Sequence, residues 1–175
     1  MQQALDADRE YLAKIADNVS RLRHAGLIRF ASADTFSGEA TYLRQYASGA
    51  FNSTFINWNP SEQAMAEAVV LTAAQRGMAV LGREALMKGE LFAMAEDAGI
   101  ADRALVARCA LAWAISEPHL SSMVVGVASP EQLAAACAVL EAPRLNDEEQ
   151  AALAAILASK RFQAHLIDWR SAFRP

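Results

Sequence analysis

The chain has 175 residues, a length typical of one domain, and hydrophobic residues make up 54% of it, enough for a sizeable core and too many for a disordered chain. Its formal net charge is −4 and its lysines and arginines are scattered, which argues against a nucleic-acid interface. The longest apolar runs are too short to span a membrane and the N-terminus is polar and acidic, so we expect a cytoplasmic protein.

Apolar residues at helical spacing predict a first helix over residues 6–25, ended by Gly26. Short, mainly apolar runs predict four buried strands at residues 27–33, 50–57, 78–82 and 121–127. Further helices are predicted at residues 38–47, 60–76, 103–116, 129–140, 147–159 and in the tail after 160, and residues 85–99 are predicted as a loop followed by a helix. Because strands alternate with helices, the pattern predicts an α/β fold with a parallel sheet of about four strands covered by helices.

Helix starts are marked by residues that accept hydrogen bonds from backbone amides. The starts are Asn59 with Pro60 and Glu62, Asp102, Ser129 with Pro130, and Asn146 with Glu149, the last pair forming a capping box. The amides at such a start also suit an anion, so the segment from Ser129 to Gln132 is open to two interpretations: a phosphate site, or, as in most helix starts of this kind, a cap alone.

Few side chains suggest catalysis or metal binding. Cys109 and Cys137 lie in apolar helical contexts and are interpreted as buried free thiols rather than as a disulfide or as ligands. The tyrosines at positions 11, 42 and 46 fall on predicted helices, away from strand ends, and Tyr11 with Lys14 is interpreted as a surface or packing pair. The histidines at positions 24, 119 and 165 show no metal spacing and are interpreted as structural.

Three segments, "ARCALAWAISEP", "LSSMVVGVASPEQLAAACAVL" and "PRLNDEEQAAL", resemble the C-terminal part of the aldo/keto reductase family. Upstream, "HAGLIRFASADTF", "FINWNP" and "RGMAVLGREALMKGEL" resemble earlier strands and loops of the same family, and the likeness extends to about residue 155. The positions that carry it are Gly26, Ile28, Arg29, Leu86, Gly89, Leu91, Ala107, Ala110, Leu111, Trp113, Gly126, Ser129, Pro130, Glu131, Gln132, Leu133, Leu145, Glu148 and Glu149.

Aldo/keto reductases are (β/α)8 barrels of the TIM type that reduce carbonyls with NADPH, and a complete barrel needs about 250 residues. The resemblance therefore implies a half-barrel over residues 1–175, strands five to eight of the family. The family's catalytic tyrosine, aspartate, lysine and histidine come from the other half, so we expect no catalytic residue in this chain.

The resemblance implies NADP(H) contacts at Trp58, Asp34, Thr35, Leu86, Lys88, Gly89, Gly126, Ser129 and Gln132. In the family, the position of Trp58 stacks on the nicotinamide, those of Asp34 and Thr35 touch the carboxamide, and Leu86 to Gly89 belong to the pyrophosphate loop. For Trp58 a second interpretation stays open, an aromatic side chain that packs at the end of its strand. Phe55, Glu84 and Ala136 replace polar contact residues, and the carboxylate of Glu84 repels a pyrophosphate unless Lys88 offsets it. We therefore expect cofactor binding to be weak or lost.

Two functions stay open at this point: half of an oxidoreductase that is active only when completed, or a non-catalytic interaction or regulatory module. Four parallel strands leave two edges and an open apolar face, so we expect a homo-oligomer or a partner chain that supplies the first half-barrel, unless the sequence is part of a longer product. The tail either covers a pocket or, as we expect, packs on outer helices through Phe162, Leu166, Ile167 and Trp169. The substrate is not predicted.

Overall fold

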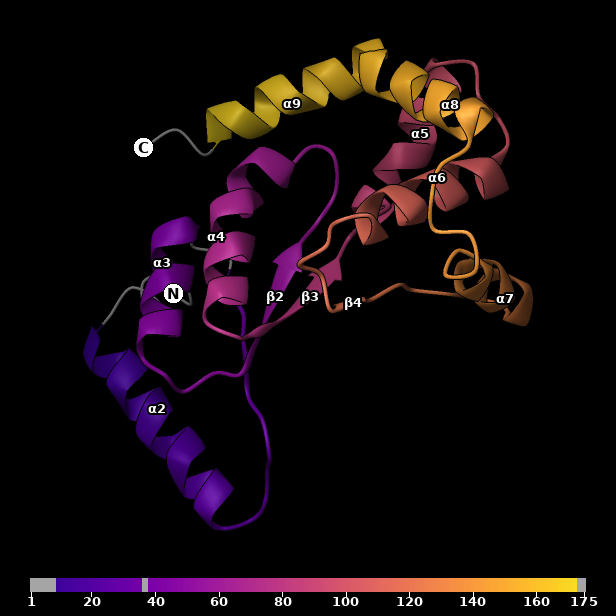
Figure 1. The fold of residues 1–175 in the computed structure, drawn as a ribbon. Coiled ribbons are helices and arrows are strands. Elements are labelled where there is room, and N and C mark those ends of the chain that lie inside the picture. The colour runs from indigo at the N-terminus through magenta and orange to yellow at the C-terminus, as the bar shows by residue number, and fades with distance from the viewer. Residues whose placement is uncertain (1–8, 36–37, 173–175) are drawn as a thin grey trace. The chain divides into compact units, whose positions relative to one another are not determined.

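The computed structural model describes residues 9–35 and 38–172, and over this part the chain is an α/β protein with a four-stranded parallel sheet and eight α-helices (Figure 1). The elements are α2 (Arg9–His24), β1 (Ser32–Ala33), α3 (Glu39–Ala47), β2 (Ser53–Asn57), α4 (Gln63–Gln75), β3 (Ala79–Arg83), η1 (Met87–Gly89), α5 (Glu90–Asp97), α6 (Arg103–Ile115), β4 (Ser122–Met123), α7 (Pro130–Ala138), α8 (Asp147–Ala158) and α9 (Lys160–Ala172).

The strands lie side by side in the order in which they occur in the chain, β1-β2-β3-β4. β1 pairs with β2 in parallel, with Ser32 opposite Ser53 and Ala33 opposite Thr54. The predicted parallel sheet of four strands is therefore confirmed. β1 and β4 have two residues each, fewer than the apolar runs at 27–33 and 121–127 suggested, because an edge strand has a hydrogen-bonded neighbour on one side only.

The chain divides into two compact units. The strand unit contains Met1–Ile56, Ala64–Gly82 and His119–Ser122, and the helical unit contains Asn57–Gln63, Arg83–Pro118 and Met123–Pro175. A single half-barrel domain over the whole chain stays a prediction.

In the strand unit, two tyrosines of α3 form hydrogen bonds with β2. The Tyr42 hydroxyl donates to the Phe55 carbonyl at 2.9 Å, and the buried Tyr46 hydroxyl donates to Thr54 Oγ1 at 3.0 Å. Burial raises the pKa of Tyr46 to about 12, although the bond to Thr54 works in the opposite direction. These tyrosines are therefore structural, as their predicted helical positions suggested.

Side chains of the central strands are buried alternately. Thr54 and Ile56 of β2 and Val80 of β3 are almost fully buried, whereas the residues between them are half-buried. The sheet is thus more open on one face, although the apolar runs had predicted strands that are buried throughout. Gly26, at the end of the first helix, has a φ of 69°, the left-handed conformation expected of a glycine that ends a helix.

The helical unit has its core between α5, α6, α8 and α9. Leu91, Met94, Val106, Ile156 and Phe162 form the buried centre of this core. Burial of Phe162 and packing of Leu166 confirm that the tail helix packs on other helices. The prediction is wrong for Ile167, which is 69% exposed, and the side chain of Trp169 lies outside the described residues.

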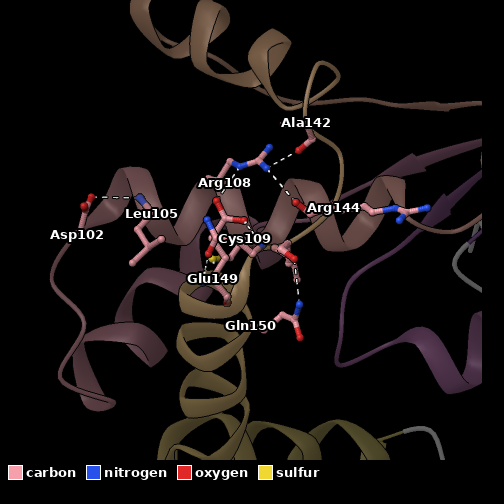
Figure 2. A network of polar contacts seen from close by, with 10 residues as sticks. Asp102, Leu105, Arg108, Cys109, Ala142, Arg144, Glu149 and Gln150 are labelled. Carbon is pink, nitrogen blue, oxygen red and sulfur yellow. Dashed lines mark hydrogen bonds and ion pairs between the residues drawn. The ribbon is translucent and has the colours of Figure 1, made fainter.

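A polar network joins α6 to the start of α8 (Figure 2). Asn146 and Glu149 form the predicted capping box, and Glu149 Oε1 also accepts from Arg108 Nε at 3.0 Å. The Arg108 guanidinium donates further to the carbonyls of Ala142 and Arg144 in the preceding loop. The backbone amide of Asn146, together with Arg108, holds the pKa of Glu149 below its ordinary value.

The two cysteines differ in their surroundings. Cys109 is buried beside the Arg108–Glu149 network, and burial raises its pKa to about 11, which makes the thiol unreactive at neutral pH. The interpretation of Cys109 as a buried free thiol is confirmed. Cys137 is also a free cysteine, but the prediction that it is buried is wrong: this thiol is exposed, because α7 buries none of its side chains.

We expect Tyr46→Phe to make the free energy of unfolding depend less on pH in the alkaline range. The phenol has a pKa of about 10 in an unfolded chain, so the folded state binds its proton more tightly. The resulting stabilisation is complete below about pH 10 and is lost as the pH rises towards about 12. Urea unfolding of the variant should therefore show a smaller fall in the free energy of unfolding across this window, whereas Thr54→Val, which keeps the phenol, should retain the fall. Parallel curves for wild type and Tyr46→Phe would contradict the assignment.

We expect Arg108→Met to lower the free energy of unfolding by about 2 kcal/mol, because it leaves the buried carboxylate of Glu149 and the carbonyls of Ala142 and Arg144 without this donor. Because the pKa of Glu149 is lower in the folded chain than in the unfolded chain, its carboxylate stabilises the fold at pH values above the unfolded pKa, and this stabilisation is lost as the pH falls through the folded pKa. Glu149→Gln should therefore reduce the loss of the free energy of unfolding at acidic pH. Arg161→Met is the matched control: its pair with Glu90 is about half exposed on both sides, so its loss should cost less than about 1 kcal/mol. Equal effects of the two arginine variants in urea unfolding would contradict the expectation.

Candidate functional site

The carboxyl ends of β2 and β3 meet in the helical unit. The backbone amide of Trp58 donates to the carbonyl of Arg83 at 2.9 Å, which places the residues following the two strands side by side. Five polar residues gather here, and we call them the strand-end cluster: Asn57, Asn59, Glu62, Arg83 and Glu84. In parallel α/β folds, this end of the strands is where ligands bind.

Asn59 is at the centre of the cluster and is fully buried. Its Nδ2 donates to Glu62 Oε1 at 3.1 Å and to the Glu84 carbonyl at 3.3 Å, and its Oδ1 accepts from the amide and hydroxyl of Ser61. The side chain thus joins the loop after β2 to the loop after β3. The sequence had marked Asn59 as a helix cap, but α4 begins only at Gln63 and the asparagine caps the turn before it.

Arg83 and Asn57, the last residues of β3 and β2, contact each other across the strand ends. Arg83 Nε donates to Asn57 Oδ1 at 2.8 Å, and Asn57 Nδ2 lies 3.5 Å from Glu62 Oε1. The guanidinium plane is therefore fixed by a neighbouring strand. Sequence analysis missed this pair, although a polar residue at the end of each apolar strand was a signal that could have revealed it.

Trp58 does not have an open ring face. It is 2% exposed and stacks on Trp113 of α6, with ring centroids 5.9 Å apart and ring planes 20° apart. Its indole Nε1 is buried and has no hydrogen-bond acceptor in the part of the chain that the structure describes. The resemblance implied that the Trp58 ring stacks on the nicotinamide, but the indole of Trp113 already covers one face of this ring.

The loop from Glu84 to Gly89 contains the residues predicted to bind a pyrophosphate. Lys88 Nζ lies 3.5 Å from Glu84 Oε1, so the lysine offsets this carboxylate, as the sequence suggested. The backbone is strained here, because Glu84, Met87 and Lys88 have φ values of 63°, 52° and 56° without being glycines. Gly89, at 95°, caps α5, and Leu86 packs against the core of the helical unit.

Ser129 and Gln132 are engaged in local hydrogen bonds. Ser129 Oγ accepts from the Gln132 amide at 3.3 Å, as predicted for a cap, and Gln132 Oε1 accepts from the Ala128 amide at 2.8 Å. Glu131 adds a carboxylate to the same turn, and its bond with the Ser129 hydroxyl lowers its pKa. Among the described residues, no hydrogen bond or ion pair joins Ser129 or Gln132 to Lys88 or Gly89.

The remaining predicted contacts lie elsewhere. Gly126 is exposed between β4 and α7. Asp34 and Thr35 follow β1 in the strand unit, where the Asp34 carbonyl accepts from Gln45 Nε2 at 3.2 Å and Thr35 is buried. Of the predicted contacts, Trp58, Leu86, Lys88 and Gly89 belong to the segments of the helical unit that follow β2 and β3.

The strand-end cluster offers a guanidinium, two amides and two carboxylates, groups that bind through charge and hydrogen bonds. In residues 9–35 and 38–172, no group of three or more histidine, cysteine or acidic side chains is placed to hold a metal ion, and no helix is long and apolar enough to cross a membrane. Comparison with protein-family models gave no match, and comparison with curated proteins gave none either.

We expect Asn59→Ala to lower the free energy of unfolding by about 2 kcal/mol, because it leaves the Ser61 amide without its acceptor and removes one of the two donors to the Glu84 carbonyl, which keeps the Met87 amide at 2.8 Å. Urea unfolding monitored by tryptophan emission measures this and also reports on the neighbouring Trp58–Trp113 stack. Asn18→Ala, on the exposed surface of α2, should change the value by less than about 0.5 kcal/mol. Similar values for the two variants would show that the buried amide does not hold the two loops together.

Proposed function

We propose that the chain is the C-terminal half of an aldo/keto reductase-type barrel, with a degenerate NADP(H)-binding region, and that this half does not reduce carbonyls by itself. The observation that carries the proposal is the order of the strands. A doubly wound sheet reverses its strand order at a switch point, whereas a barrel sheet keeps neighbouring strands in sequence. The order β1-β2-β3-β4, with a polar cluster at the carboxyl ends of β2 and β3, supports a segment of a barrel.

Carbonyl reduction requires a group that gives a proton to the substrate oxygen as hydride arrives. The buried hydroxyl of Tyr46 faces Thr54 in the core, and its pKa of about 12 makes it a poor acid near neutrality. Tyr42 likewise donates to a backbone carbonyl beside α3. Within the described residues, the strand-end cluster contains neither a tyrosine nor a histidine, so proton delivery has to come from another half-barrel.

The residues present do not fit NADP(H) well. Trp113 covers a face of Trp58, and Glu84 brings a carboxylate to the loop that would hold the pyrophosphate. Ser129 and Gln132 bond within their own helix start, where Glu131 adds a further negative charge. We therefore derive no catalytic step through the cofactor, and its binding is weak or lost.

A second candidate function is a non-catalytic interaction module. It is favoured by apolar side chains next to the outer strands, because Leu27, Phe30 and Val124 are 72%, 68% and 51% exposed. The two functions differ in whether adding the missing half restores carbonyl reduction. Neither gives turnover by this chain alone.

We expect the purified chain to show no saturable NADPH binding at millimolar cofactor and no aldehyde-dependent NADPH oxidation. Calorimetry measures the binding, and loss of NADPH absorbance measures the oxidation. Glu84→Ser removes the carboxylate from the loop and should strengthen any residual binding, whereas Glu90→Ser, an exposed glutamate on α5, should not. Steady aldehyde reduction by the wild-type chain would overturn the proposal.

A further inference from the structure

We draw no further inference here: the strongest candidate, the apolar surface of α7 and the residues just after it, where Leu133, Cys137 and Leu140 are exposed, carries none because nothing in the described part of the chain shows what covers it.

Discussion

The buried amide of Asn59 is the interaction on which the carboxyl end of the sheet depends. An amide side chain removed from water costs several kcal/mol unless its donors and acceptor are paired. Asn59 satisfies this requirement with partners from both loops, the Glu84 carbonyl on one side and Ser61 and Glu62 on the other. The loops after β2 and β3 are therefore fixed together, and Trp58 and Arg83, which neighbour these partners in the chain, take their positions from the same bonds.

The bonds that fix this end of the sheet also occupy the groups that a ligand would use. Glu62 accepts from Asn59 and lies near Asn57, the carboxylate of Glu84 lies beside Lys88, and Trp58 is stacked on Trp113. An enzyme site normally keeps some polar groups positioned for the transition state rather than for one another. Here the polar groups bond to one another and stabilise the loops themselves.

Local features of the fold were predictable from the sequence because they depend on neighbouring residues. The caps at Asp102 and Ser129 and the Asn146–Glu149 box involve residues at most three apart and lie where they were expected. The site itself depends on contacts between distant residues. Trp58 and Trp113 are on different elements, as are Asn57 and Arg83, and no local pattern specifies which residues of two elements will touch. The exposure of Cys137 was missed for the same reason, since alanine-rich spacing predicts a helix but not whether another element covers it.

The strand order connects the architecture to the chemistry. In the part of the chain that the structure describes, the strands follow one another across the sheet in the order of the sequence, so the loops after β2 and β3 are neighbours. This order brings together residues that are far apart in the chain, and Asn57 and Arg83 bond across the strand ends while Asn59 bonds to the Glu84 carbonyl. The chemistry of this end of the sheet therefore follows from the strand order, which places amides, carboxylates and a guanidinium next to one another.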